Sequence, residues 1–386
     1  MRIGVLVEPE NERRVALVPT SLKKLNRAGV EVIVEAGAGL AAGYVDDAYT
    51  EAGASIVDRN EALKADLIIS IHLPEVTSLP ERSTIACVAD PFRHPDRIRA
   101  CMDRNITLLS MDMIPRRLSR AQSMDVNSSQ DNLAGYKAVL LGAAHVPRGI
   151  PMMTTSAGTV RPAKFVVMGS GVAGLQAIAT AKRLGAVVHA SDVRLAAKEQ
   201  IESVGGRFIH VDGMEDFEDE SGYAKPLTPE FIQKVNDTVC DVASDADVII
   251  TTARIFGRPA PITVPTSALA SFKRGAVVVD MNADVGGNCE STVPGEIIDV
   301  DGVTVVGLQN LPGTLANTAS MLYSNNLTTF ALSIIKDGSL VMGEDDDVIH
   351  GAPEGSEFHV KGMGGVLICS GGTIHPKQER LAGVIG

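Results

Sequence analysis

Short apolar runs alternate with polar, helix-compatible segments in the first third of the chain. Five runs predict strands that are buried on both faces, at 2–7, 30–34, 66–70 with an extension to 72, 84–88 and 106–110. Between the first two runs, Thr20 is expected to cap a helix that ends at Gly29. This alternation predicts an α/β domain with a parallel sheet.

A second α/β pattern begins in the middle of the chain. The apolar run 165–168 leads into the segment GSGVAG at 169–174, and apolar residues at helical spacing continue as far as Gly185. Another strand pattern covers 186–190 and is followed by Asp192. Strand, glycine-rich turn, helix, strand and acid in this order form the fingerprint of a dinucleotide-binding unit.

Each position of this fingerprint has a physical role. Gly169 permits a tight turn, Gly171 lets the backbone approach a pyrophosphate, and Gly174 lets the helix pack close to the strand. The Asp192 carboxylate would accept from the ribose hydroxyls and repel a 2′-phosphate, which favours NAD(H) over NADP(H). Arg194 acts in the opposite sense. We expect cofactor contacts here from Gly169, Ser170, Gly171, Val172, Gly174, Asp192, Val193 and Arg194.

The later elements extend the second domain and then return to the first. Strand patterns at 247–252, 276–280 and 304–307 continue the second sheet, whereas 319–335 reads as a helix that packs back on the first domain. We predict two Rossmann-like, doubly wound parallel-sheet domains separated by a cleft. Their expected extents are 1–128 with 312–386 for the first domain, and 129–311 for the second, which opens on a connecting helix at 129–141.

Composition narrows the functional class. The chain has 386 residues and a net charge of −12, which disfavours broad binding to nucleic acid or anionic membranes. No apolar run reaches the roughly 18–20 residues of a membrane span, and the first residues form a strand pattern instead of a signal peptide. We expect a soluble cytoplasmic chain. Its five scattered cysteines predict structural thiols, and the acidic run 344–347 a solvated turn in preference to a metal site.

Polar side chains are dense between residues 117 and 130, where composition alone favours a solvated interdomain loop. The segments SRAQSMD at 119–125, SSQ at 128–130 and NLAGY at 132–136 resemble the NAD(H)-binding component of proton-translocating NAD(P)⁺ transhydrogenase. The resemblance continues through 152–159, the fingerprint, 179–206 and 286–289. The start of the chain, at 12–16, resembles both that family and alanine dehydrogenase.

The resemblance implies a subunit that binds NADH and presents it to NADP⁺ on a partner subunit. Hydride would pass directly between the two nicotinamides, coupled to proton translocation through membrane-embedded subunits. The resemblance further implies a homodimer that is attached to the membrane only through these partners. Such a reaction needs close placement of two rings and no general acid or base.

The resemblance also assigns site residues. Catalytic placement of the nicotinamide would fall to Arg117, Gln122 and Asp125, and the neighbouring contacts to Leu118, Ser119, Ser123, Met124 and Ser128. A mobile loop carrying Gly222 and Tyr223 would cover the adenosine half. Two positions depart from the family pattern, because Val235 replaces a glutamine and Arg254 a leucine; the backbone of Arg254 is still expected to contact the cofactor.

Two other functions stay open at this point. An alanine dehydrogenase would need a substrate-binding lysine and a catalytic histidine in the first domain, where this chain has His72 and the stretch 87–89 without a histidine. Asp284 stands where that enzyme carries a functional aspartate, although a strand-end acid with a local hydrogen bond fits the position as well. The third function is a non-catalytic module that senses NAD(H).

Overall fold

The computed structural model describes residues 1–214, 228–255 and 257–385. The chain divides into two compact units, of which unit 1 is Met1–Gln130 with Gly313–Gly386 and unit 2 is Asp131–Pro312. Unit 1 is therefore built from two separate stretches of sequence. Helix α5 (Val126–His145) begins in unit 1 and ends in unit 2.

Unit 1 contains a mixed eight-stranded sheet with the order β19-β18-β6-β5-β4-β1-β2-β3. Its six parallel strands are β1 (Arg2–Val5), β2 (Glu31–Glu35), β3 (Ser55–Val57), β4 (Leu67–His72), β5 (Thr84–Val88) and β6 (Thr107–Ser110). The antiparallel edge comes from the end of the chain, with β18 (Leu367–Ser370) and β19 (Thr373–Ile374). The helices are α1 (Pro19–Arg27), α2 (Asp46–Glu51), α3 (Arg59–Ala62), α4 (Pro95–Asp103), α10 (Ala316–Ile334), α11 (Asp347–His350) and α12 (Glu379–Ile385).

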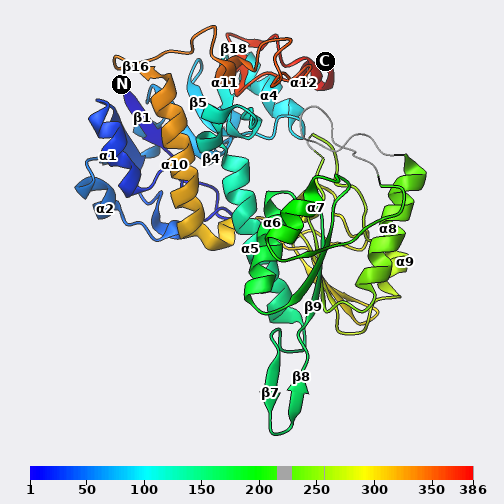
Figure 1. Cartoon of the computed structure of the whole chain (residues 1–386). Helices are drawn as coiled ribbons and strands as arrows, with labels where there is room; N and C mark the ends of the chain where they lie inside the picture. Colours follow the sequence, from blue (N-terminus) through cyan, green and yellow to red (C-terminus); the bar gives the residue numbers. More distant parts are fainter. Residues whose placement is uncertain (215–227, 256, 386) are drawn as a thin grey trace. The chain divides into compact units, whose positions relative to one another are not determined.

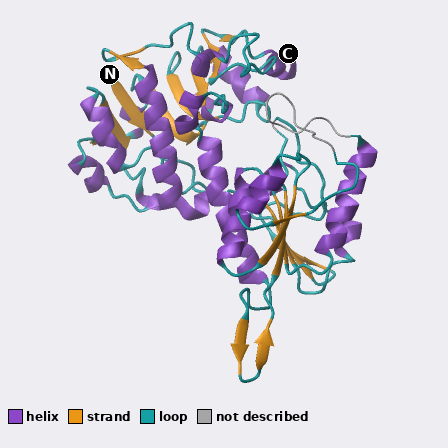
Figure 2. Cartoon of the chain, in the orientation of Figure 1, coloured by secondary structure: helices purple, strands orange, loops and turns teal. Residues whose placement is uncertain are grey.

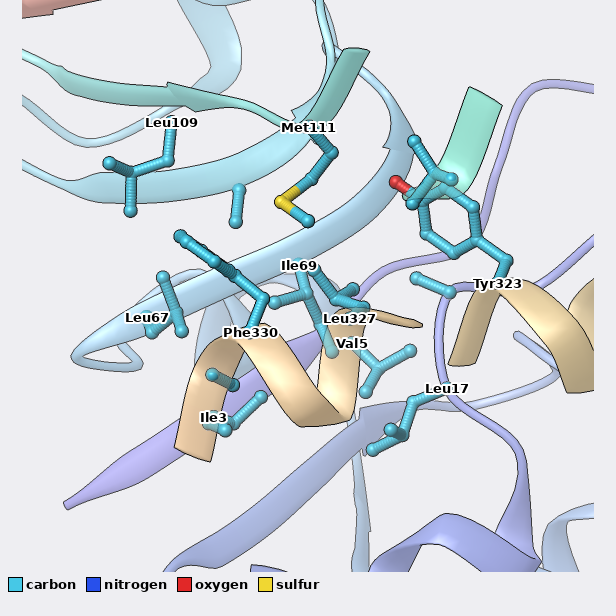
Figure 3. Close-up of a cluster of buried hydrophobic side chains, with 14 of the residues drawn as sticks. Ile3, Val5, Leu17, Leu67, Ile69, Leu109, Met111, Tyr323, Leu327 and Phe330 are labelled. Carbon is cyan, nitrogen blue, oxygen red and sulfur yellow. The ribbon is translucent and has the colours of Figure 1, made fainter. Parts of the chain in front are cut away.

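Helix α10 completes the core of unit 1, although it follows unit 2 in the sequence. Its side chains Tyr323, Leu327 and Phe330 are fully buried against strand residues such as Ile69 (Figure 3). Burial of each large apolar side chain stabilises the fold by about 1.5–3 kcal/mol. The Tyr323 hydroxyl donates to the Ser70 carbonyl at 3.0 Å, so its polar atom is satisfied within the core.

Unit 2 contains a seven-stranded sheet with the order β11-β10-β9-β12-β13-β15-β14. The strands are β9 (Lys164–Met168), β10 (Val187–Ser191), β11 (Arg207–Phe208), β12 (Val248–Thr251), β13 (Val277–Asp280), β15 (Val303–Val306) and the antiparallel β14 (Ile297–Val300). Helices cover both faces (Figure 2), α5 and α6 (Val172–Arg183) on one, α8 (Pro229–Ala243) and α9 (Thr266–Leu269) on the other, with α7 (Ala197–Ser203) after β10. Alternate residues of β9, Phe165 and Val166, pack into the two opposite cores, which makes the sheet doubly wound.

A small hairpin extends from unit 2, formed by β7 (Met153–Thr155) and β8 (Gly158–Val160) (Figure 1). All six of its strand residues are exposed, and the preceding Met152 is 66% exposed. Among the residues that the structure describes, no helix is both long enough and apolar enough to cross a membrane.

The α/β fold class predicted from the sequence is confirmed, with three corrections. Both sheets carry antiparallel edge strands and are therefore mixed. Helix α1 begins at Pro19 with Val18 at its N-cap, so the prediction that Thr20 caps it was wrong; the fixed φ of proline already suits the first helical position. The first strand ends at Val5 instead of continuing to residue 7.

Candidate functional site

The edge of unit 2 at which β9 and β12 end is the site that the topology favours. From β9, the chain order runs to β10 and β11 on one side of the sheet and to β12 and β13 on the other. Ligands of doubly wound sheets bind at the carboxyl ends of the strands where the order reverses in this way. Gly169 follows β9 at this edge, and Thr252 follows β12. The Thr252 hydroxyl donates to the Gly169 carbonyl at 3.0 Å and fixes the two strand ends together.

The three fingerprint glycines are required for different reasons. Gly169 has a φ of +101°, which L-residues rarely adopt. A Cβ atom at Gly174 would lie 2.0 Å from the Gly169 carbonyl oxygen, so helix and turn are in backbone contact. Gly171 has a φ of −64°, and a Cβ there would meet no atom of the described residues within 4 Å other than those of its chain neighbours. Neither conformation nor packing explains Gly171, whereas close approach by a ligand would.

The space beside Gly171 adjoins the beginning of α6. Gly171 is the N-cap residue and provides no side-chain cap for the first amides of the helix. Such amides need acceptors, and the helix dipole favours an anion at this position. The local structure therefore fits a phosphate group in front of the glycine turn.

Asp192 lies next to this turn at the end of β10. One carboxylate oxygen accepts from the Ser170 amide at 2.9 Å and the Ser170 hydroxyl at 2.8 Å, and the other accepts from the Arg194 amide at 3.0 Å and Nε at 2.9 Å. Burial alone would raise the pKa of Asp192, but the hydrogen bonds from Arg194 and Ser170 hold it below its ordinary value. Asp192 is therefore ionised at neutral pH.

The pairing of Asp192 with Arg194 bears on cofactor choice. Arg194 also donates through Nη2 to Asp192 at 3.0 Å, so the guanidinium binds the carboxylate with two nitrogens. A ribose diol at Asp192 would have to share these acceptors with Arg194. Because the arginine is already paired with an acid, it is less available to a 2′-phosphate, which favours NAD(H).

The polar loop of unit 1 forms a 3₁₀ helix (Ser119–Met124) directly before α5. Its Leu118 and Met124 side chains are buried in the core of unit 1, whereas Ser119, Gln122 and Ser123 are exposed. The buried residues anchor the loop and leave the polar ones to face outward. Leu118 and Met124 were both expected to contact the cofactor, but only a small part of each residue is accessible.

Asp125 and Ser128 are brought together at the start of α5. The Asp125 carboxylate accepts from the Ser128 amide at 2.9 Å and from the Ser128 hydroxyl at 2.5 Å, as an N-cap residue does. Arg116, which the sequence did not single out, forms an ion pair with Asp125 through Nε at 3.3 Å. The sequence gives little indication of this ion pair beyond the position of Arg116 directly before Arg117.

The two other arginines of the loop contact the C-terminal segment of the chain. Arg117 donates through Nη1 to the Glu357 carbonyl at 3.0 Å, and its guanidinium carbon lies 5.9 Å from the centre of the Phe358 ring. Arg120 pairs with Asp346 and Asp347, and Asp346 also caps α11. The acidic run is thus partly used by an ion pair and a helix cap.

The remaining predicted contacts are of two kinds. Gly222 and Tyr223 lie outside the described residues. Val172 starts α6 and Val193 separates Asp192 from Arg194, both within the fingerprint unit. Arg254 is exposed and lies two residues after Thr252. The contact of the Thr252 hydroxyl with Gly169 was not predicted, although the two threonines at 251 and 252 were a sequence signal for a polar contact at the end of β12.

Of the residues relevant to an amino-acid dehydrogenase, His72 and Cys87 lie in unit 1 and Asp284 lies in unit 2. His72 Nε2 lies 2.9 Å from a Glu12 carboxylate oxygen, and the same oxygen accepts from Arg14 at 2.6 Å. Cys87 is buried, and burial raises the pKa of its thiol well above the ordinary value. Asp284 is exposed. His72 is therefore paired with an internal acid, and the thiol that stands in place of a histidine holds its proton.

Two sheets with helical layers and one glycine-rich turn define a two-domain, Rossmann-like α/β protein. Its family follows from two family models, Alanine dehydrogenase/PNT, N-terminal domain, which matches residues 4–134, and Alanine dehydrogenase/PNT, C-terminal domain, which matches residues 138–356. The chain belongs to the alanine dehydrogenase/PNT family.

Within this family the chain is similar to transhydrogenase subunits. It is 45% identical over 366 residues to a protein of Rhodospirillum rubrum that is named as the first part of NAD(P) transhydrogenase subunit alpha, covering 91% of this chain and 95% of that protein. The crystal structure of transhydrogenase from Sinorhizobium meliloti superposes with a TM-score of 0.85 at 39% identity, covering 97% and 100% of the two chains. Alanine dehydrogenase of Bacillus subtilis is 26% identical over 377 residues, with 93% and 92% covered. The resemblance seen in the sequence is confirmed, and alanine dehydrogenase is the more distant relative.

Proposed function

We propose that this chain is the NAD(H)-binding subunit of a proton-translocating NAD(P)⁺ transhydrogenase. It would pass hydride directly between its own NAD(H) and NADP(H) on a partner subunit. The observation that carries this proposal is the open, uncapped turn at Gly171 beside the ionised Asp192, in a chain similar over most of its length to transhydrogenase alpha subunits. The similarity supports the partner-dependent aspect of the proposal, since those relatives are named as subunits.

The residues of unit 2 fit the phosphate and ribose groups of NAD(H). The amides at the start of α6 would hold the pyrophosphate, and the space beside Gly171 admits it. Asp192 would accept from the adenosine ribose, with Arg194 and Ser170 keeping its carboxylate ionised and oriented. When bound, the cofactor supplies the hydride chemistry. Gly222, Tyr223 and the backbone of Arg254 are proposed to complete this half of the site.

The loop of unit 1 is proposed to orient the nicotinamide. Arg117, Gln122 and Asp125 offer a cation, an amide and a carboxylate, and Asp125 is already fixed by Ser128 and Arg116. Hydride exchange between two rings removes no hydroxyl proton, so these side chains have only to place the donor and acceptor carbons about 3–3.5 Å apart. That task needs orienting hydrogen bonds and no general base.

The proposed assembly is a homodimer that binds separate NADP(H)-binding and membrane-embedded subunits. The hairpin of unit 2 supports a contact between copies, because Met152, Met153 and Val160 are large apolar side chains exposed to solvent. The chain would then be held at the cytoplasmic face of the membrane through its partners.

Nucleotide binding and hydride transfer test this function together. The purified chain should bind NADH more tightly than NADPH, and stopped-flow mixing with an NADP(H)-binding transhydrogenase component should give rapid transfer only in the mixture. Alanine-dependent reduction of NAD⁺ by the chain alone would instead establish the alanine dehydrogenase alternative, which the pairing of His72 with Glu12 disfavours. Binding without either reaction would leave an NAD(H)-sensing module.

A further inference from the structure

A buried polar network lies behind the candidate site in unit 2. Asp280, at the end of β13, is 1% exposed. One of its carboxylate oxygens accepts from the amides of Asn288 at 2.7 Å and Cys289 at 2.9 Å and from the Thr292 hydroxyl at 2.7 Å. The other accepts from the Asn282 amide at 3.0 Å. Asp280 thereby fixes the turn that carries both Asn282 and Asn288.

The two asparagines converge on a single backbone carbonyl. Asn282 and Asn288 donate through Nδ2 to the Ala253 oxygen at 3.0 and 2.8 Å. Asn282 Nδ2 also lies 2.7 Å from Asn288 Oδ1, and Asn288 donates to the Pro261 carbonyl at 2.7 Å. Both side chains are buried, so the Ala253 carbonyl is held inward by two desolvated donors.

This fixed carbonyl determines the direction of the next amide. In a trans peptide the C=O and the following N–H point in opposite directions, and the described chain has no cis bond. The Arg254 N–H therefore points away from the interior. Among the described residues, neither the Ala253 nor the Arg254 N–H has an acceptor. Both follow Thr252 at the carboxyl edge, and the Ala253 nitrogen would lie 3.2 Å from a Cβ placed on Gly169.

We propose that Asn282 and Asn288 are positioning residues, which aim the Arg254 N–H at an acceptor atom of the bound nicotinamide nucleotide. The proposal rests on the function proposed above. It deepens that function by explaining what orients the backbone that follows β12 at the candidate site. Nothing in the Asp280 network itself has to touch the nucleotide. The network would affect binding only by fixing the orientation of the peptide group between Ala253 and Arg254.

A double-variant cycle tests this coupling. Asn282→Ala removes one of the two donors, and Arg254→Pro removes the N–H that they aim. Each should weaken NADH binding by about five- to tenfold, as expected for loss of one hydrogen bond. Because both changes act on the same contact, the double variant should bind no more weakly than Arg254→Pro alone. Thr292→Val is the control, since Thr292 binds Asp280 but not the Ala253 carbonyl, and its affinity should change less than about twofold.

Thermal unfolding of each variant separates positioning from general loss of structure. Multiplicative losses of affinity in the double variant, or an equal loss in Thr292→Val, would overturn the proposal. So would a folded Asn282→Ala variant with the affinity of the parent chain. If Asn282→Ala does not fold, Asn282→Ser takes its place with the same expected result. A parent chain that binds no NADH would refute the proposed function instead, and is thus a distinguishable outcome.

Discussion

The two sheets offer the same kind of ligand position and fill it differently. In unit 1, β1 is flanked by β2 and β4, so the strand order reverses there as it does beside β9 in unit 2. At the unit 1 position, Glu8 accepts from the Ile71 amide at 2.5 Å, and Glu12 is paired with Arg14 and His72. The carboxylates of Glu8 and Glu12 therefore already accept from the Ile71 amide and the Arg14 guanidinium, which are the donors that a ligand would need.

In unit 2, no side chain that the structure describes occupies the equivalent position. At the equivalent place unit 1 has a charged segment, whereas unit 2 has Gly171. Apart from its chain neighbours, no atom of the described residues lies within 4 Å of the place that a Cβ on Gly171 would take. The comparison teaches that topology specifies where a ligand could bind, while a few side chains decide whether the position is a site or a structural ion-pair cluster.

The largest expected effect comes from breaking the ion pair of unit 1. In Arg14→Met, Glu12 would lose its bidentate partner while both positions stay almost fully buried. Removal of one member of a buried pair costs about 3–5 kcal/mol of unfolding free energy. Urea unfolding measures this loss, and NADH affinity of the folded variant should be unchanged. A loss below about 1 kcal/mol would show that the cluster is not structural; Lys64→Met, which breaks the exposed ion pair with Glu61, is the control.

The pH dependence of stability should expose Glu8. Burial raises the pKa of Glu8 to about 7, against the opposing hydrogen bonds from Ile71 and His72. The folded state thus holds this proton more tightly than the unfolded state. The resulting stabilisation is complete below pH 4.5 and is lost as the pH rises through 7.

Glu8→Gln should remove this dependence. Relative to the parent, the variant should gain up to about 3 kcal/mol of unfolding free energy between about pH 5 and pH 8. Glu12 contributes in the opposite sense, because hydrogen bonds from Arg14 and His72 overcome the effect of burial and lower its pKa, so its stabilisation is lost only in acid. Parallel stability profiles for parent and variant across this pH range would contradict the prediction.

In unit 2, Gly171→Ala should separate binding from folding. Its methyl group would enter open space, so the melting temperature should stay within about 2 °C. NADH affinity should fall at least about tenfold, because the methyl group occupies the position proposed for the pyrophosphate. Gly343→Ala, another glycine with free space, should change neither quantity. Unaltered affinity in Gly171→Ala would remove the turn from the site.

Gln122→Ala should affect the reaction and leave affinity nearly unchanged. The side chain is exposed on a loop anchored by its buried neighbours, so folding should not suffer. Loss of an orienting hydrogen bond should slow stopped-flow hydride transfer about tenfold. Transfer at the parental rate in the reconstituted mixture would end the proposed role. Ser123→Ala tests whether the neighbouring hydroxyl also helps to orient the nicotinamide.

The smallest expected effect concerns the contact between Arg117 and Phe358. A cation–π contact at an exposed site contributes about 0.5–1 kcal/mol, and here it competes with any use of Arg117 by a nucleotide. Phe358→Ala should therefore tighten NADH binding by about two- to fivefold, measured by titration. Phe358→Tyr keeps the ring and should match the parent. Weaker binding in Phe358→Ala would mean that the ring supports Arg117 in place of competing for it.

The sequence predicted the central strands well, for a physical reason. Strands buried on both faces are continuous apolar runs, and β5 (Thr84–Val88) was located to the residue. The antiparallel strands β18 and β19 were missed, because each is short and gains its partner only through a distant segment, as in the pairing of Leu367 with Leu109. The hydrophobic pattern of a short segment does not reveal which distant strand it will pair with.

The same limit applies to the candidate site. The glycine turn and Asp192 were predictable because their spacing is local and each residue type has one physical purpose. The partners of the loop arginines were not, since Glu357 and Asp346 come from a segment that only the folded unit brings near. Arg116 and Thr252 likewise act through tertiary contacts.

The divided sequence of unit 1 has a consequence for synthesis on the ribosome. The strands β1 to β6 emerge first, but the helix that supplies Tyr323, Leu327 and Phe330 to their core follows only after all of unit 2. At about 5–20 residues per second, this delay is roughly 10–45 s. Unit 2 can be completed in that interval, whereas the nascent first sheet would wait with an apolar face uncovered. The chain is therefore expected to need chaperone protection during translation, in proportion to how slowly residues 111–334 are made.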